Sequence, residues 1–415
     1  MVERSTAKNC KPSIGRCQRE GLSEDFAEYR DVLGSLVLRS GAVYNNHCVP
    51  YISCGKMIDD SVLHRPKMSY HDALNYLAQK TSVIELYDRL GGRVAVCPEW
   101  NGRILTSTCE GLEGESFGCV HVQAIDAEHF EDYGGEDHWT LSPIVHSFAV
   151  ETIKEHKAVL QRTLQTNDAN GVPGEFHLSR TISLLNKQKI ETWFGDAVAD
   201  SFGQEDVSAV GFCSENTVKV PEKTCIASRL RGMFNPSPNT VVVLSTPPDI
   251  FASEPSSMEP SPMEPSQMEL SSMDVDYLGS APHGRIRHLP HALLVHADGR
   301  GRCQVTMPFA EAPLIIGAIE LRFGTLTLWT FDVPNDSEKD AIRIYNSGHS
   351  HTEELDWTAY YETNCFSAAR ELLPDDSLTY YQATLHLNAG NDVLDGLVRQ
   401  LFDVSLEEIA KKMHL

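Results

Sequence analysis

The residues best suited to chemistry gather in the run FEDYGGEDHW, which extends from Phe130 to Trp139. Its two adjacent glycines can take positive φ angles and let the backbone approach a ligand closely. Glu136, Asp137 and His138 follow at once, so two carboxylates and an imidazole stand beside the indole of Trp139. These groups suit recognition of a polar ligand of the size of a sugar, and an acidic, solvated turn is the alternative interpretation.

The carboxylates in this run raise the question of a metal. Oxygen ligands from Glu131, Asp132, Glu136 and Asp137 suit a hard cation such as calcium. The alternating spacing of a dedicated calcium loop is missing, so we expect no metal and no other cofactor, with calcium as the alternative. The eleven cysteines are irregularly spaced, which favours reduced thiols over a disulfide framework.

Composition narrows the class of partner. The 415 residues carry a formal net charge of -23, which argues against nucleic acid and against anionic membrane surfaces and favours neutral or cationic partners. No run of about 18 apolar residues and no secretory h-region is visible. The sequence therefore predicts a cytoplasmic protein without a membrane partner, and its oligomeric state stays open.

The elements that must position these residues are mainly strands. The spacing of apolar residues predicts a helix from Ser69 to Asp88, with Ser69 as its N-cap, followed by the first strand. Short β-branched or aromatic runs, separated by turn residues, continue along the chain and predict a large antiparallel β-sandwich. They lie at 93–96, 103–106, 148–152, 180–185, 240–244, 293–296, 315–321, 325–331 and 378–387. Helices are expected at 185–193, 391–401 and 406–413.

The predicted domain organisation has three parts. Residues 1–66 form an appendage of unclear structure, and 67–251 with 277–415 form one β domain. Between its two segments, residues 252–276 repeat Ser, Met, Glu and Pro at a five-residue period, which matches neither helix nor strand. The prolines and the acidic residues there predict a disordered insertion.

Seven runs, in this order, resemble a bacterial family of unknown function within the galactose mutarotase-like (aldose 1-epimerase) superfamily. The runs are PEWNGRILTSTCEG (98–111), FEDYGGEDHW (130–139), GFCSENTVKV (211–220), RGMFNPSP (231–238), IYNSGH (344–349), YYETNCFSAARELLPDDSLTYYQATLHL (360–387) and FDVSLEEI (402–409). The resemblance covers roughly residues 70 to 410. It implies a β-supersandwich with a few peripheral helices and a carbohydrate cleft on the concave face of one sheet.

The resemblance also implies roles for two residues. Glu362, in the run YET, stands where mutarotases hold their general-base glutamate, and Arg103, in NGRI, stands where they keep a substrate-binding arginine. A carboxylate on an apolar sheet face can take a proton from an anomeric hydroxyl, and an arginine fork can grip ring oxygens. Surface ion pairs are the alternative interpretation of both residues.

The sequence departs from the mutarotase pattern at two positions. Tyr133 and Thr217 stand where mutarotases have histidines, so the usual acid for the ring oxygen is missing. His138, with an ordinary pKa near neutrality, is expected to substitute as the second catalytic residue. Further expected ligand contacts come from aromatic and polar side chains of the cleft and its rim: Trp100, Tyr133, Trp139, Tyr345 and Asn346.

The sequence thus predicts a carbohydrate-active protein that binds or processes a sugar, with mutarotase-like isomerisation as the leading activity. A non-catalytic sugar-binding or scaffold protein is one alternative. A lyase or glycoside hydrolase that uses a pair of carboxylates is another, and it requires two carboxyl groups about 5 to 9.5 Å apart. The identity of the sugar is not encoded in any of these motifs.

Overall fold

The computed structural model describes residues 68–141, 146–245, 274–278, 284–300, 302–308, 315–332, 341–347, 359–367 and 369–415. All of these residues belong to one compact unit, Asp60–Leu415. The predicted appendage at 1–66 and most of the predicted insertion, 252–273, lie outside the described residues.

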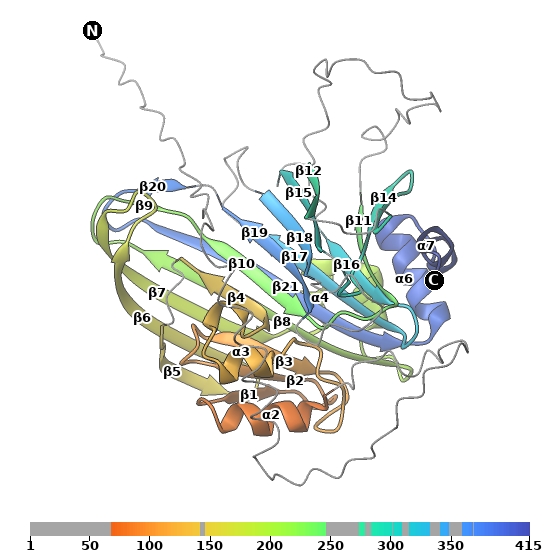
Figure 1. The fold of residues 1–415 in the computed structure, drawn as a ribbon. Helices are drawn as coiled ribbons and strands as arrows, with labels where there is room; N and C mark the ends of the chain where they lie inside the picture. The colour runs from red at the N-terminus through yellow and green to blue at the C-terminus, as the bar shows by residue number, and fades with distance from the viewer. Residues whose placement is uncertain are drawn as a thin grey trace, which may run out of the picture. The chain divides into compact units, whose positions relative to one another are not determined.

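Two large antiparallel sheets make up most of this unit (Figure 1). The first sheet has nine strands in the order β1-β2-β3-β4-β10-β19-β18-β15-β12. In chain order, these strands are β1 (Ile84–Tyr87), β2 (Arg93–Cys97), β3 (Arg103–Thr108), β4 (Gly135–Thr140), β10 (Arg229–Phe234), β12 (Asp274–Leu278), β15 (Arg302–Pro308), β18 (Ala341–Ser347) and β19 (Tyr360–Phe366).

The second sheet has ten strands in the order β13-β14-β11-β16-β17-β21-β8-β7-β6-β5. They are β5 (Ala149–Lys154), β6 (Lys157–Asn167), β7 (Pro173–Leu184), β8 (Val207–Lys219), β11 (Thr240–Ser245), β13 (Ile286–His288), β14 (Ala292–His296), β16 (Ile316–Glu320), β17 (Thr325–Asp332) and β21 (Ser377–Ala389). A small pair, β9 (Thr224–Ile226) and β20 (Arg370–Leu372), stands apart from both.

Short helices cover parts of the sheets. They are α2 (Tyr70–Ala78), α3 (Val122–Asp126), the 3-10 turn η2 (Phe130–Asp132), α4 (Lys187–Phe194), α5 (Asp196–Ser201), α6 (Asn391–Phe402) and α7 (Leu406–Met413). Within the described ranges, no helix has the length and apolar character needed to cross a membrane. The predicted mainly β sandwich with a few peripheral helices is confirmed.

The main hydrophobic core lies between the two sheets. Strand residues alternate between the two faces of a sheet, so Leu230 of β10, Tyr361 of β19 and Ile344 of β18 point into this core together with Phe212 of β8. We call the opposite side of the nine-stranded sheet its outer face. Near β2 and β3 this face is covered by α2 and α3, which pack Leu77 and other apolar side chains on it.

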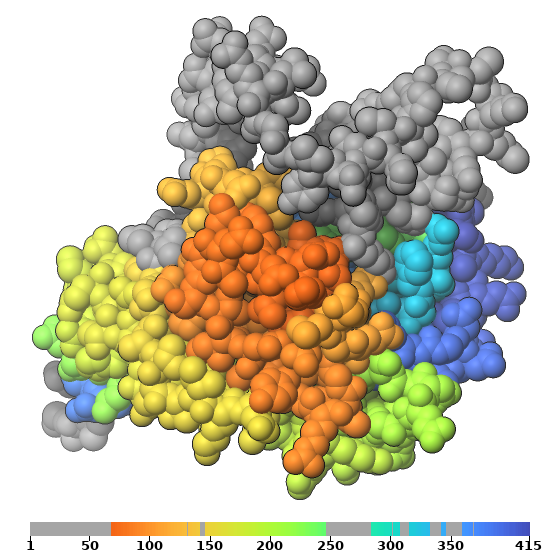
Figure 2. All heavy atoms as spheres, turned by 90° about the horizontal axis from the view of Figure 1, so that it is seen from below, coloured from red at the N-terminus to blue at the C-terminus, as the bar shows by residue number. Residues whose placement is uncertain are grey.

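A view from below shows the edge where the two sheets meet (Figure 2). The orange residues of α2 and β1 to β3 border the yellow residues of β5 and β6 there. Contacts of β1 with β6 and β7 join the edge strand of one sheet to the other. This closure holds β3 and β4, which carry most of the predicted site, against the second sheet.

Two predicted boundaries need correction. The helix at Ser69 is confirmed and its N-cap hydroxyl accepts a hydrogen bond from the amide of Asp72, but the helix ends at Ala78, well before Asp88. The disordered insertion was placed at 252–276, whereas Asp274–Leu278 forms β12 and pairs with β15. The alternation of Val275 and Tyr277 with polar residues is the strand signal that the repeat obscured.

Candidate functional site

An irregularity in β4 decides where the residues of the EDHW run point. Opposite β10, His138 pairs with Arg231, but the next paired residue is Gly135 with Met233, so two residues of β4 oppose one of β10. This extra residue is a β-bulge, which re-aims neighbouring side chains. The predicted Gly-Gly turn is therefore a bulged strand, and its polar side chains are divided between the two faces of the sheet.

Glu136 and Asp137 point into the space between the sheets, where both are fully buried. Oε2 of Glu136 accepts from Ser107 Oγ at 2.9 Å and lies 2.5 Å from Nε2 of His386 on β21. Asp137 pairs with Arg180 of β7 at 2.5 Å. The sequence led us to expect both carboxylates beside His138. In the structure they lie on the other side of the sheet, where Asp137 forms an ion pair with Arg180 and Glu136 lies against His386.

Trp139 is also an inter-sheet residue. Its side chain is 2 % exposed in the main core, and its Nε1 donates to Ser228 Oγ at 2.8 Å. A buried indole with a satisfied N–H is a packing residue rather than a platform for a sugar. Of the four acidic residues considered for calcium, Glu136 and Asp137 are engaged in these contacts between the sheets. The described residues hold no group of three His, Cys, Asp or Glu side chains arranged for a metal.

Arg103 and His138 lie on the outer face. The guanidinium of Arg103 donates to the carbonyl oxygens of Gly134 and Phe130 at 2.9 and 3.3 Å, and its Nη2 lies 3.2 Å from Nε2 of His138. Arginine only donates, so Nε2 accepts and the ring hydrogen is on Nδ1. Among the described residues, no partner lies within hydrogen-bond distance of this buried Nδ1.

The electrostatic surroundings of His138 are strongly positive. Burial lowers the pKa of this imidazole well below its usual value, and Arg103, Arg231, Arg229 and Arg180 lower it further. The pKa near neutrality expected from the sequence is therefore wrong, because a charged ring would be desolvated among arginines. At neutral pH His138 is a neutral hydrogen-bond donor, not an imidazolium acid.

Glu362 lies on the same face, held by two arginines that the sequence analysis missed. Arg231 Nε donates to its Oε2 at 2.5 Å, and Arg229 Nη2 lies 3.5 Å from its Oε1. Arg229 also donates twice to Asn364 Oδ1, at 2.9 and 2.6 Å. The signal was present in RLRGMF, where two arginines alternate with apolar residues and so share one strand face.

Two tyrosines complete this group at its solvent side. Tyr345 is the cross-strand partner of Glu362, and its ring meets that of Tyr360 edge to face at 6.2 Å between centroids. Burial raises the pKa of both phenols, and Glu362 contributes to each shift. Tyr345, Tyr360 and Arg229 are partly exposed, whereas Arg103 and His138 are buried, so access from solvent is on the tyrosine side.

The remaining predicted contacts lie beside this group or outside it. Tyr133 packs between the rings of Trp100 and Phe130 in the cluster under α2 and α3, with centroid distances of 4.8 and 5.2 Å. Asn346 lies on β18, and its side chain is outside the described residues. Thr217 lies on β8, where its hydroxyl forms a hydrogen bond with that of Thr379. Since β8 belongs to the ten-stranded sheet, Thr217 is not on the outer face of the nine-stranded sheet.

We define the outer-face cluster as Arg103, His138, Arg229, Arg231, Tyr345, Tyr360 and Glu362. It brings together Glu362 and His138, which are 224 positions apart in sequence, because Arg231 on β10 is the strand partner of His138 and the ion-pair partner of Glu362. Arg103, Glu362 and His138 thus lie on one face of the nine-stranded sheet. Glu136, Asp137 and Trp139 are on the other side of the same sheet.

Comparison with solved structures finds weak likenesses over most of this chain. A galactose mutarotase-like protein from Lactobacillus casei has 9% identity and a TM-score of 0.44, covering 74% of this chain and 100% of its own. The GalM/aldose epimerase homologue from C. elegans has 9% identity and a TM-score of 0.41, covering 75% and 100%. The Slr1438 protein from Synechocystis has 10% identity and a TM-score of 0.44, covering 75% and 96%.

Sequence comparison gives the family. No curated protein matches this chain. The model of one family, described as Family of unknown function (DUF6786), matches residues 68–150 and 144–413, which together span most of the sequence and nearly all of the described unit. The chain therefore belongs to the family of unknown function DUF6786.

Proposed function

We propose that the outer-face cluster binds a carbohydrate that carries an acidic group. The observation that supports this most directly is the pairing of two guanidinium groups, those of Arg229 and Arg231, with the carboxylate of Glu362, while the guanidinium of Arg103 lies beside His138 on the same face. Arginine forks recognise carboxylate and phosphate groups through paired hydrogen bonds. The excess of positive charge distinguishes this face from the strongly acidic chain as a whole.

The half-buried tyrosines favour a sugar over a simple anion. Tyr345 and Tyr360 offer aromatic faces and hydroxyl groups at the solvent side of the cluster. An aromatic ring beside charged hydrogen-bonding groups suits a ligand with one apolar face and several polar edges. A uronic acid has this combination of a ring and a carboxylate.

The chemistry that we propose for the bound sugar is interconversion of its anomers. Glu362 takes the proton from the anomeric hydroxyl, the bond from C1 to the ring oxygen breaks, and its electron pair goes to that oxygen. His138 supports the oxygen through a hydrogen bond from neutral Nδ1–H, since Arg103 fixes this tautomer. Ring closure on the other face and return of the proton complete the exchange. This proposal also rests on the resemblance of the runs around Glu362 and Arg103 to those of mutarotases.

The test pairs binding with exchange. Calorimetry with glucuronate, galacturonate, glucose and galactose should show that the two uronates bind at least tenfold more tightly than the neutral sugars. NMR exchange spectroscopy on the same four sugars then measures anomer interconversion. Equal binding of uronates and aldoses would exclude the acidic preference, and no binding of any of the four would exclude the carbohydrate site.

A substitution separates binding from catalysis. Glu362→Gln keeps the shape of the side chain and removes the base, so exchange should fall on the order of 100-fold or more while uronate binding stays within tenfold. Glu371 lies on β20, where it is exposed and pairs with Lys223, so Glu371→Gln is the matched control. It should change neither uronate binding nor anomer exchange. Binding without exchange in the unmodified protein would support the non-catalytic alternative.

A further inference from the structure

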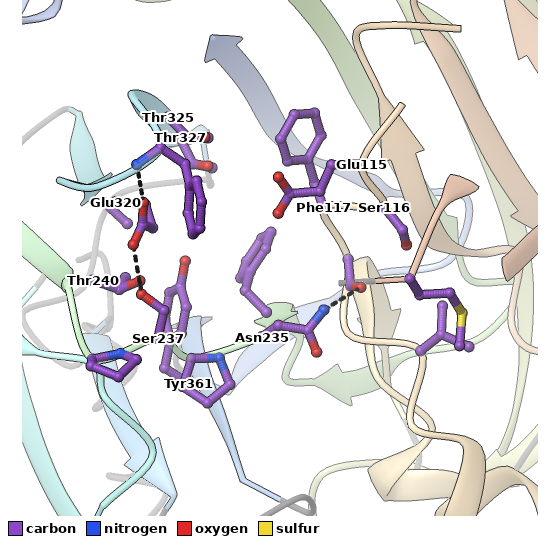
Figure 3. Close-up of a pocket in the computed structure, with 18 residues that line it drawn as sticks. Glu115, Ser116, Phe117, Asn235, Ser237, Thr240, Glu320, Thr325, Thr327 and Tyr361 are labelled. Atoms are coloured by element: carbon purple, nitrogen blue, oxygen red, sulfur yellow. Dashed lines mark hydrogen bonds between the residues drawn. The ribbon is translucent and has the colours of Figure 1, made fainter. Parts of the chain in front are cut away.

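A second candidate site lies away from the outer-face cluster, in a cavity of about 310 Å³ (Figure 3). Its walls come from residues 115–118, from the connection between β10 and β11, and from β16, β17 and β19. Tyr361 lines this cavity, while the next residue, Glu362, belongs to the outer-face cluster on the other side of the strand. A volume near 300 Å³ is at the lower end of the range for small-molecule sites.

The hydroxyl groups on one wall have already donated their hydrogens. Ser237 Oγ donates to Oε1 of Glu320 at 2.9 Å, because a carboxylate oxygen can only accept. Thr240 Oγ1 must therefore donate to Ser237 Oγ, at 3.0 Å. Thr325 Oγ1 donates to the amide oxygen of Asn388 at 2.8 Å. Ser237 Oγ also accepts from the amide of Asn239 at 3.1 Å, so its hydrogen-bonding capacity is filled. Each hydroxyl has one hydrogen, so Thr240 and Thr325 can only accept hydrogen bonds from a ligand.

The charged residues of the cavity are acidic, so they also favour a ligand that donates hydrogen bonds. Glu320 and Glu115 line it, and among the described lining residues there is no Lys, Arg or His. Glu320 is 9 % exposed and is held in place by Ser237 and by the amide of Phe323, at 2.6 Å from Oε2. Burial raises the pKa of the Tyr361 phenol, and the charges of Glu136, Glu320 and Glu115 raise it further. An anion placed in this cavity would be repelled.

Aromatic rings make up the apolar part of the wall. Phe234 and Tyr361 stack with centroids 5.5 Å apart and an interplanar angle of 29°, and Phe117 lines the cavity with them. Figure 3 shows Tyr361 beside Ser237, and Phe117 on another side of the cavity with Glu115 and Ser116. Aromatic rings attract cations through their negative faces. The cavity therefore combines acceptors, carboxylates and aromatic rings and offers few donors.

We propose that this cavity binds a small organic ammonium ion. An ammonium group has three hydrogen-bond donors and no acceptor, which matches a cavity lined mainly by acceptors. Glu320 provides the opposing charge, and the aromatic rings contact the hydrocarbon part of the ligand. This site and the outer-face cluster take ligands of opposite charge.

Three ligands of the same shape test the proposal. Cyclohexylammonium, cyclohexanol and cyclohexanecarboxylate differ mainly in charge, and calorimetry on the full chain at pH 7 measures the affinity of each. The ammonium ion should bind at least tenfold more tightly than the alcohol, and the carboxylate should not bind. Equal affinity for alcohol and ammonium, or binding of none of the three, would overturn the proposal.

Two substitutions assign the binding to this cavity. Glu320→Gln removes the charge and should weaken ammonium binding at least tenfold, whereas the exposed Glu371→Gln should leave it unchanged. Ala318 lines the cavity, so Ala318→Met extends a side chain into it, keeps both carboxylates and should abolish binding. If Glu320→Gln does not fold by circular dichroism, Ala318→Met decides. Ammonium binding that survives filling of the cavity would refute the assignment.

Discussion

At the scale of single residues, His138 shows how surroundings change the role of a side chain. Its type suggested an acid for neutral pH, but burial among arginines holds the ring neutral and leaves it as a hydrogen-bond donor. The tautomer follows from Arg103, because a guanidinium at 3.2 Å from Nε2 forces the ring hydrogen onto Nδ1. Burial and the surrounding arginines thus keep the ring neutral, and Arg103 fixes the direction of donation.

This depressed pKa predicts a pH dependence of stability. His138 is neutral in the folded state, and in the unfolded chain its pKa is about 6.5. Above about pH 6.5 the ring is neutral in both states, and the free energy of unfolding does not depend on its titration. As the pH falls below that value, the unfolded chain takes up the proton first, and the free energy of unfolding falls by up to about 1.4 kcal/mol per pH unit. His138→Gln should lose stability less steeply, and urea unfolding between pH 7 and 5 measures the two slopes. Parallel curves for the two proteins would contradict this account.

At the scale of elements, the bulge in β4 and the glycines beside it together set the path of the strand. Gly134 and Gly135 have φ angles of 88° and 109°, which favour glycine, and they bring the strand against the carbonyl of Cys119. The carbonyl of Gly134 also accepts from Arg103. The geometry of the turn therefore positions a member of the outer-face cluster.

Replacing Gly134 by alanine should disrupt the close packing of this strand. A Cβ there would lie 1.7 Å from the carbonyl oxygen of Cys119, so the backbone must move. Gly171 is the matched control, because its φ is 82° but a Cβ would meet nothing within 4 Å. Gly171→Ala should cost only the strain of positive φ, about 1 to 2 kcal/mol, whereas Gly134→Ala should cost several kcal/mol in urea unfolding. Similar costs for the two variants would show that the close approach is unimportant.

At the scale of the whole molecule, net charge and local charge differ in sign. The chain carries a net charge of -23, yet the outer-face cluster contains three arginines and one glutamate, and two of these arginines pair with the glutamate. The net charge of the whole chain favoured neutral or cationic partners, whereas the proposed ligand of the outer-face cluster is acidic. Alternation along strands explains the difference, because residues that are dispersed in sequence meet on one face only after the strands pair.

The cysteines give a test of the fold as a whole. All seven described cysteines are free and buried, and burial raises the pKa of Cys213 and Cys303 to about 12. A buried thiol of high pKa is a poor nucleophile. Of the eleven thiols in the chain, at most four should therefore react rapidly with Ellman's reagent in the native protein, and all eleven in guanidinium chloride. Rapid reaction of more than four would show that the sandwich opens.

The sequence by itself determined the local elements. The helix predicted at 406–413 is α7, Leu406–Met413, where Ser405 and Glu408 form a capping box, and the helix predicted at 391–401 is α6 with one more residue. The predicted runs at 240–244 and 325–331 are β11 and β17. Periodicity and capping depend on residues that are close in sequence, so these elements can be predicted without the tertiary structure. Arg103 and Glu362 were proposed from the resemblance of the runs around them to those of mutarotases.

Only the tertiary structure decided which of these residues meet. The bulge in β4 sends Glu136 and Asp137 inward and His138 outward, although the three are consecutive. The arginines at 229 and 231 were missed because charged residues in a strand are typical of a solvated face, and their partner Glu362 is more than 130 positions away. A single inserted residue reverses the facing of every side chain beyond it, and strand pairing across a sheet depends on contacts between distant segments.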